Sequence, residues 1–211
     1  LFFYQFNMTE NNQSFFSLSS QILSAQSSLS GLLIAIFTIM SIGKEYKDGT
    51  LRKNIIDGYT REDFYIGKLL VLTIAVCLAF LIGFLCLFVG AVFLGQLSDL
   101  AQILSPPFII NYFVKLFYTG LFAMFLIYLF QKSTLSLVMY FVWGIIESIV
   151  IGINQAVFQI NIADYLPKSS IDAVLITSMT VEWSAVLITS FYIVAMLFLP
   201  YFLFIKRDIL S

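Results

Sequence analysis

The sequence predicts an all-α integral membrane protein, a helical bundle with five full membrane spans, on three observations. Of its 211 residues, 60% are hydrophobic and only 11% are charged, whereas soluble domains average about 45–50% apolar and about 25% charged residues. The mean hydropathy is +0.97. Five apolar stretches are each long enough to cross a hydrocarbon core of about 30 Å as a helix, which takes about 20 residues. This composition excludes a soluble domain, a disordered chain and a nucleic-acid-binding protein.

The predicted spans follow one another within a single transmembrane domain over residues 1–211. They are Ile22–Gly43, Lys68–Leu94, Phe108–Phe130, Thr134–Asn154 and Trp183–Ile205. The segment Leu1–Phe6 is apolar but too short to cross a membrane, so we interpret it as the last turns of an earlier, truncated span. Residues 155–182 form a long connection whose apolar runs favour re-entrant or surface-lying helices over a plain loop.

The basic residues are distributed unevenly over the connections between the spans. Nine of the eleven lysines and arginines lie in residues 43–68, in the 131–133 turn or after Ile205. Cytoplasmic connections carry the excess of Lys and Arg, so we expect these three regions, including the C-terminus, to be cytoplasmic and residues 155–182 to be extracytoplasmic. The first visible span then starts outside, which implies one missing span and six spans in the intact chain.

Residues 44–67 are the most informative connection, because residues 44–64 carry 10 of the 23 charges. Thr50 is placed to cap a short amphipathic helix, which we predict over Leu51–Asp57. Gly58 suits the left-handed residue that ends a helix. Thr60 and the acidic residue three positions later form the pattern of a capping box, which predicts a second helix that runs on into the next span. The connection is therefore a helix, a break and a helix.

The same connection resembles the signature after the second span in permeases of type-2 ATP-binding cassette (ABC) exporters, and it looks most like the bacterial versions. The pattern is Glu-x-x-x-Gly-Thr-Leu-Arg followed by Gly-x-Thr-Arg-x-x-Phe-x-x-x-Lys. The matching residues are Glu45, Gly49, Thr50, Leu51, Arg52, Gly58, Thr60, Arg61, Phe64 and Lys68. The family has six spans, as the charge distribution also implies here.

The resemblance implies that this connection contains the coupling helix that contacts an ATPase. The residues expected to serve ATPase coupling are Glu45, Gly49, Thr50, Leu51, Arg52, Ile55, Gly58, Thr60 and Arg61. The implied partners are ABC ATPase subunits, which hold ATP and Mg, and a second permease copy that is identical or different. The residues alone, without the resemblance, favour a solvated basic loop that carries an interfacial helix.

The first visible span has a continuous face of small and hydroxyl-bearing residues. Its members include Ser24, Ser27, Gly31 and Thr38. Small residues let helices in lipid approach each other closely, so this face is either a packing face within one subunit or the wall of a transport pathway or dimer seam. The resemblance implies that this span lines the route between the two permeases, as the family's second and fifth spans do, so both interpretations stay open.

Two charged residues lie inside predicted spans, where a lone charge is costly. Lys115 and Glu147 fall at matching depths in consecutive spans that the short 131–133 turn joins. We therefore predict an intramembrane ion pair between them. The alternative is that Lys115 snorkels to the outer headgroups while Glu147 is protonated or hydrated.

Together these observations predict the permease subunit of an ATP-driven ABC transporter in the bacterial inner membrane. We expect it to export a hydrophobic or amphipathic substrate by alternating access. The sequence contains no phosphate-binding Gly-x-x-x-x-Gly-Lys-Ser/Thr loop, so ATP hydrolysis is expected on a partner chain, with no catalytic residue, metal or cofactor in this one. The alternatives are a non-transporting membrane sensor or anchoring protein and, third, an intramembrane enzyme.

Overall fold

The computed structural model describes residues 15–94, 106–157, 166 and 183–206, and these are helical apart from short turns. The helices are α2 (Phe15–Lys47), α3 (Thr50–Ile56), α4 (Arg61–Leu94), α6 (Pro106–Phe130), α7 (Ser133–Val157) and α9 (Trp183–Lys206). All of them except α3 are long and apolar enough to cross a membrane. The predicted fold class, a helical membrane protein with five visible spans, is confirmed for this part of the chain.

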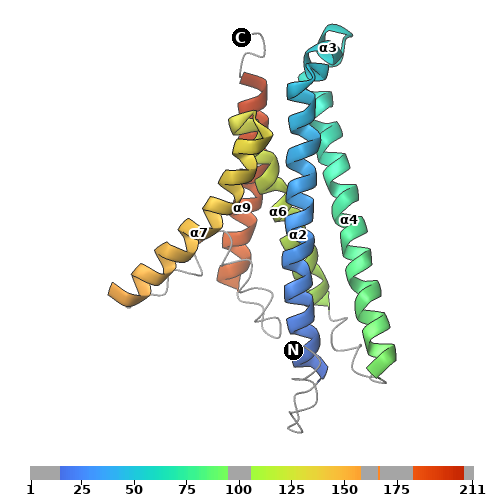
Figure 1. Cartoon of the computed structure of the whole chain (residues 1–211), viewed down its shortest axis with the longest axis vertical. Coiled ribbons are helices and arrows are strands. Elements are labelled where there is room, and N and C mark those ends of the chain that lie inside the picture. The colour runs from blue at the N-terminus through green and yellow to red at the C-terminus, as the bar shows by residue number, and fades with distance from the viewer. Residues whose placement is uncertain (1–14, 95–105, 158–165, 167–182, 207–211) are drawn as a thin grey trace.

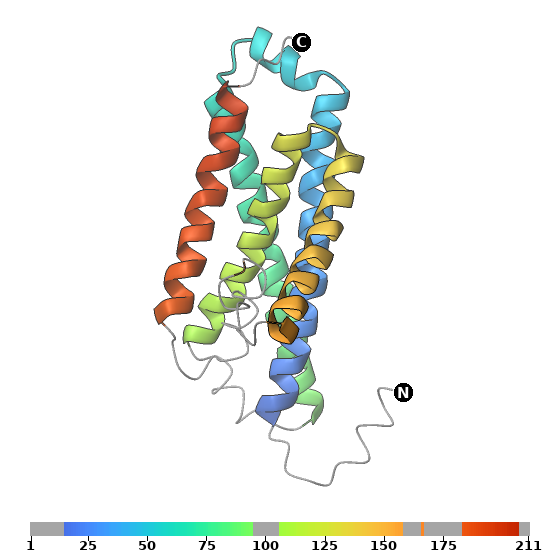
Figure 2. The same ribbon diagram turned by 90° about the vertical axis from the view of Figure 1, so that its left-hand side faces the viewer.

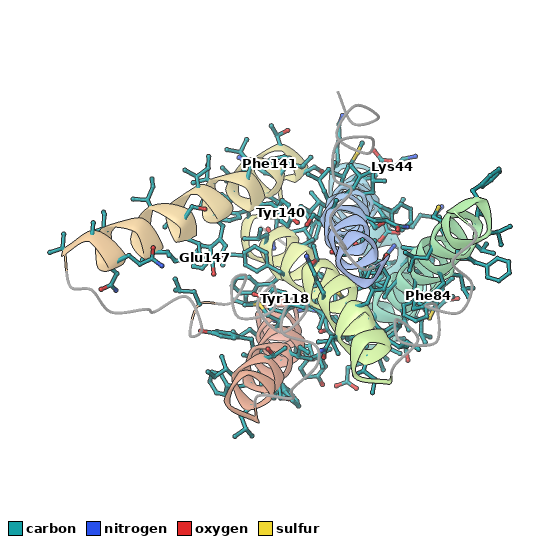
Figure 3. The ribbon with its side chains drawn as sticks, turned by 90° about the horizontal axis from the view of Figure 1, so that it is seen from below. Lys44, Phe84, Tyr118, Tyr140, Phe141 and Glu147 are labelled. Atoms are coloured by element: carbon teal, nitrogen blue, oxygen red, sulfur yellow. The ribbon has the colours of Figure 1, made fainter. Side chains whose placement is uncertain are left out.

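Helix α6 lies at the centre of the bundle and packs against α2, α4, α7 and α9, as the view along the bundle shows (Figure 3). In its membrane-crossing segment 61% of the residues are buried, against 11% in that of α7. The main core therefore forms around α6, and the outer faces of the surrounding helices present apolar side chains to the membrane. Gly31 of α2 makes one close approach possible, because a Cβ there would lie 3.3 Å from the side chain of Thr119 on α6.

Helix α7 leaves the bundle along its length. It starts beside α6 and α2 but diverges from them toward its C-terminal end (Figure 1). Within α7, Ser136 and Glu147 are the buried residues among those described.

The three basic connections lie at the same end of the molecule. Helix α3, the turn between α6 and α7, and the C-terminal end of α9 all meet there (Figures 1 and 2). We call this the basic end. The charge distribution predicts one common side for these three regions, and the arrangement of the helices agrees with it.

Most of the predicted extracytoplasmic connection 155–182, including its proposed surface helices, lies outside the described residues, while α7 extends to Val157.

The capping signals of the basic end are largely confirmed. Helix α4 begins at Arg61, seven residues before the predicted span, because the predicted capping box forms. The backbone N–H of Asp63 donates to the Thr60 hydroxyl at 3.1 Å, and the backbone N–H of Thr60 donates to the Asp63 carboxylate at 3.3 Å. Reciprocal bonds of this kind satisfy backbone donors at the start of a helix, so the helix can begin well before the apolar segment.

The prediction for α3 needs a correction of one residue at each end. The helix runs over Thr50–Ile56 rather than over residues 51–57. The carbonyl of Gly49 accepts the backbone bond from Lys53, which makes Gly49 the N-cap. Thr50 does not cap the helix, since its hydroxyl donates to the carbonyl of Glu45 at 3.4 Å.

Candidate functional site

Helix α3 is a short element held across the basic end between α2 and α4 (Figure 1). The chain bends sharply on both sides of it, with φ values of +66° at Gly49 and +100° at Gly58. Residues with side chains rarely adopt these left-handed values, whereas glycine does so without steric cost. This geometry fits the predicted role of Gly58 as the residue that ends α3, and it adds Gly49 as the residue before its start. The side chains of Leu51, Arg52 and Ile55 lie outside the described part of the structure.

An ion pair closes the base of the loop that carries α3. The ammonium of Lys68 on α4 lies 2.5 Å from the carboxylate of Glu45 on α2, and it also stands over the Phe64 ring at 5.4 Å. Both charged side chains are largely buried, with 15% and 27% of their surfaces exposed. Glu45 and Lys68 are the first and last residues of the signature in the sequence, so the ends of this signature bind each other.

The first turns of α4 are fastened to the C-terminal half of α9. The guanidinium of Arg61 donates to the carbonyl of Ile205 at 2.8 Å. One turn further along α4, the hydroxyl of Tyr65 donates to the carbonyl of Leu197 at 2.7 Å. A third bond connects the two helices from the other direction, from the Tyr201 hydroxyl to the Glu62 carboxylate at 3.0 Å. The position of α4 below α3 is therefore coupled to that of α9.

Aromatic rings fill the space beneath this loop and join four helices. Tyr128 of α6 contacts Tyr46 of α2, Tyr65 of α4 and Phe204 of α9, with ring centroids 6.4, 5.9 and 5.0 Å apart. Tyr201 extends the group with a T-shaped contact to Tyr65 at 5.5 Å. We call these five residues the aromatic cluster. Each such pair contributes about 0.5–1.5 kcal/mol beyond the burial of its surface, so the cluster stabilises the packing of the four helices at the base of the loop.

The outward side of the α3 region is exposed and partly apolar. Ile56 is 77% exposed and Tyr59 is 64% exposed, and the neighbouring Lys53 is exposed as well. Exposed apolar side chains that are grouped in a polar connection are typical of a surface that contacts another protein or the membrane. The exposed tip of α3 can contact a partner, and the packed base of the loop connects α3 to α2, α4 and α9.

A second region of interest lies inside the bundle, where α7 diverges. A pocket of about 260 Å³ opens between α2, α6 and α7, and Tyr118, Tyr140 and Phe141 border this space (Figure 3). The lining residues are Ser27, Ser28, Gly31, Leu32, Lys115, Tyr118, Thr119, Phe122, Tyr140, Phe141, Trp143 and Gly144. The small-residue face predicted from the sequence contributes Ser27 and Gly31 to this lining, but the pocket itself requires the crossing of three helices.

The predicted intramembrane pair belongs to this neighbourhood. Lys115 is 9% exposed and Glu147 is 4% exposed, so neither charged group is left in the lipid. The Lys115 ammonium donates to the Ser28 hydroxyl at 3.4 Å, and Glu147 interacts electrostatically with Tyr118 and Tyr192. The burial fits the prediction, and the direct ion pair between the two residues stays a prediction.

The residues predicted to form a pathway or dimer face divide into two groups in the structure. Ser27 and Gly31 are buried and line the pocket. Thr38 is also buried, but it lies nearer the basic end, and its hydroxyl donates to the carbonyl of Ile34 at 2.8 Å. The side chain of Ser24 lies outside the described part. The role of this face as a pathway stays a prediction, and its open portion is the one beside the pocket.

These features define a polytopic α-helical membrane protein with a short exposed helix clamped between two of its spans. The family model described as ABC-2 family transporter protein matches residues 1–147. The chain belongs to this family of ABC transporter permeases, and the resemblance to type-2 ABC permeases is confirmed. No curated protein matches the chain. Membership in this family implies an ABC ATPase as a partner.

Proposed function

We propose that this protein is the permease subunit of an ATP-driven exporter in a bacterial inner membrane, with α3 as its coupling helix and the C-terminus in the cytoplasm. ATP and Mg bind to the partner ATPase, which docks on α3 and supplies the energy. The observation that carries the proposal is the clamped position of α3 between the ends of two spans, with an exposed tip and a packed base.

The electrostatics of the basic end support cytoplasmic docking. Lys44, Lys47 and Lys53 are exposed beside α3, and Lys132 is exposed in the turn between α6 and α7. Basic residues remain on the cytoplasmic side during insertion, which is the side where an ATPase has access to ATP. The apolar Ile56 and Tyr59 provide the contact surface, and the surrounding charges orient the partner.

The contacts of α4 suggest how a movement of α3 reaches the membrane. A displacement at α3 acts on α2 and α4 through the Glu45–Lys68 pair, and on α9 through Arg61 and Tyr65. The aromatic cluster resists compression between these helices because protein cores are close-packed. We propose that ATP binding on the partner changes the tilt of these spans, which opens and closes the route for the substrate.

A second permease copy completes the transporter in this proposal. The exposed apolar side of α7 and the face that includes Ser24, Ser27, Gly31 and Thr38 are the elements that would border a route between two copies. The substrate would be hydrophobic or amphipathic, because the lining residues of the pocket in this region carry few charges. Lipid covers the remaining outer surface.

The test is to break the helical backbone of α3 with a single substitution that leaves its other side chains in place. Ile55→Pro should abolish ATP-driven export and co-purification of the ATPase, since an interior proline costs about 3 kcal/mol in a helix and α3 has seven residues. Ile55→Ala is the matched control, because alanine preserves the helix. Both variants must reach the membrane at normal levels. Normal export by the proline variant would show that α3 is not the coupling element.

A further inference from the structure

The polar side chains that line the pocket between α2, α6 and α7 already have partners within the protein. The Lys115 ammonium donates to the Ser28 hydroxyl at 3.4 Å, and the Thr119 hydroxyl donates to the carbonyl of Lys115 at 2.8 Å. Ser27 and Ser28 have further polar interactions. A ligand that enters with a charge would lose its hydration and gain few bonds in return. These residues therefore favour a ligand that is uncharged.

Five aromatic residues of α6 and α7 line the same pocket, and Figure 3 labels three of them. They are Tyr118, Phe122, Tyr140, Phe141 and Trp143, and we call them the aromatic wall. Phe122 is central to this wall, because its ring centroid lies 6.3, 6.1 and 5.9 Å from those of Tyr118, Tyr140 and Trp143. These three rings are inclined to that of Phe122 by 10°, 45° and 50°. The wall therefore offers both faces and edges of rings.

The pocket has room for a small ring system and opens toward the membrane. Its volume is about 260 Å³, whereas an apolar cavity of about 150 Å³ already admits benzene. There is space for one ring or for two fused rings. Phe141 and Trp143 line the pocket although 48% and 39% of their surfaces are exposed. These two residues form its mouth, so a ligand reaches the pocket from the hydrocarbon of the membrane.

A ligand that comes from the membrane must bind better than the acyl chains that surround it. Lipid tails are as apolar as leucine, so burial of apolar surface alone provides no driving force there. Aromatic rings attract one another beyond the burial of their surfaces, in offset-stacked or edge-to-face pairs, and an acyl chain cannot form such pairs. A rigid ring system also loses less conformational freedom on binding than a flexible chain does. Both effects favour rings over lipid.

We infer that this pocket binds an uncharged aromatic group of one or two fused rings that enters from the membrane, and that the transported substrate carries such a group. The second half of this inference rests on the proposed function, whereas the binding itself does not. Lys115 is the charged side chain of the lining. Its predicted pair with Glu147 would neutralise it, which suits an uncharged ligand.

The binding test uses 3-trifluoromethyl-3-phenyldiazirine, a small uncharged aromatic photoprobe. The full-length protein is placed in phosphatidylcholine nanodiscs, irradiated with the probe and analysed by mass spectrometry for labelled residues. Phe88 of α4 is 55% exposed and does not line the pocket, so its label reports the probe dissolved in the lipid. We expect the aromatic wall to be labelled more strongly than Phe88. Labelling of the wall at or below the level of Phe88 would overturn the inference.

Competition with matched compounds identifies the chemistry that the pocket selects. Naphthalene and decalin share one carbon skeleton, but only naphthalene is aromatic. Naphthalene should halve the label on the aromatic wall at a roughly tenfold lower membrane concentration than decalin, the factor that about 1.4 kcal/mol provides. Naphthalenesulfonate carries a charge on the same rings and should compete no better than decalin. Equal competition by naphthalene and decalin would assign the pocket to lipid chains, and stronger competition by the sulfonate would assign it to an anion. Either result would overturn the inference.

Two variants with matched controls locate the preference for naphthalene. Leu32→Trp fills the pocket and should abolish the label that naphthalene suppresses. Leu33→Trp is its control, because Leu33 is 59% exposed and does not line the pocket. Phe122→Leu removes the central ring but keeps an apolar side chain, so naphthalene should lose its advantage over decalin. Phe117→Leu, in the same helix but outside the lining, should keep it. A naphthalene preference that survives in Leu32→Trp or in Phe122→Leu excludes this site.

A last measurement separates this inference from the proposed function. In the complex with its ATPase, naphthalene should stimulate ATP hydrolysis in the wild type and not in Leu32→Trp. Aromatic-selective binding without any associated ATPase would support the pocket and overturn the proposed exporter. An active ATPase complex without aromatic-selective binding would leave the exporter standing and overturn the pocket. Binding that leaves the rate of an active complex unchanged would overturn the assignment to the substrate alone.

Discussion

The charged residues within the membrane spans are the most consequential single positions. Lys115 and Glu147 are both buried, and the protein must keep each from becoming an uncompensated charge. Breaking a buried ion pair from one side typically costs about 3–5 kcal/mol, because the other charge stays buried without its partner. Removing both charges at once avoids that penalty.

We therefore predict a strong coupling between these two residues in a double-mutant cycle. Lys115→Met and Glu147→Gln should each lower the midpoint of thermal unfolding in detergent, and the double variant should regain part of the loss, with a coupling of about 1–3 kcal/mol. Thermal unfolding followed by circular dichroism measures this. Strictly additive effects would mean that the two side chains act independently and would exclude the pair.

Two glycines in the same part of the chain provide a controlled test of backbone conformation. A Cβ at Gly58 would meet nothing within 4 Å, and the same holds for Gly67, so neither substitution creates a steric contact. Of these two glycines, only Gly58 has a positive φ, at +100°. Alanine there must be strained by about 1 kcal/mol or more.

Gly58→Ala should therefore loosen α3, and Gly67→Ala should not. We expect amides of residues 50–60 to exchange hydrogen about fivefold faster in Gly58→Ala, the factor that corresponds to about 1 kcal/mol. Gly67→Ala in the interior of α4 should be neutral or stabilising by up to about 1 kcal/mol. Equal exchange rates in the two variants would show that the left-handed bend does not hold α3 in place.

At the scale of elements, α4 and α9 are connected by bonds of unequal strength. The Tyr65 side chain is 5% exposed and its hydroxyl bonds to a backbone carbonyl, whereas the bond between Tyr201 and Glu62 is exposed to solvent. Removing one partner of a hydrogen bond costs about 1 kcal/mol when the site is buried and less at a surface. The buried bond should dominate the attachment of α9.

Tyr65→Phe is therefore expected to lower stability by about 1 kcal/mol, while Tyr201→Phe changes it by less than about 0.5 kcal/mol. Hydrogen exchange of residues 197–206 should accelerate in the first variant and stay near the wild-type rate in the second. Similar effects from both would indicate that the exposed bond contributes as much as the buried one. The phenyl ring retained in each variant preserves the aromatic cluster.

The helices were predictable from the sequence to the extent that local signals determine them. Hydropathy identified all five spans, and the pattern of Thr60 and Asp63 identified the start of α4, because both depend on neighbours in the chain. The start of α2 at Phe15, seven residues before the predicted span, was not indicated, since a helix can continue past the apolar segment. The one-residue error at α3 arose because the carbonyl of Gly49, and not the hydroxyl of Thr50, begins the helix.

At the scale of the whole molecule, the contacts that define the candidate site could not be predicted. The Glu45–Lys68 pair, the bonds from α4 to α9 and the pocket all depend on how helices rotate about their axes and cross each other. Spans that are apolar on every side are only weakly amphipathic, so their sequences do not show which face of each helix points into the bundle. The burial of Lys115 and Glu147 was the exception, because charged residues in apolar spans almost always face the interior of the bundle or a cavity.

The orientation of the whole molecule is testable by labelling single cysteines. In a background without Cys77 and Cys86, which are free and exposed, cysteines at positions 132 and 206 should be protected from an impermeant reagent in intact cells. Cysteines at Ser98 and Lys168 should react with it. The basis is the excess of Lys and Arg on cytoplasmic connections. Labelling of position 132 from outside would invert the predicted topology.

Pro200 lies inside α9, between Leu197 and Ile205, which are two of the three residues of α9 that bond to α4. Proline has no N–H, so the carbonyl of Met196 lacks its donor within the helix, and α9 bends most easily there. The bond from Tyr65 reaches Leu197 on one side of this weak point, and the bond from Arg61 reaches Ile205 on the other. Helix α4 thus bonds to α9 on both sides of the position where α9 bends most easily. If α4 is displaced at its first turn, we expect the short segment beyond Pro200 to move with it at the basic end, while the rest of α9 keeps its tilt.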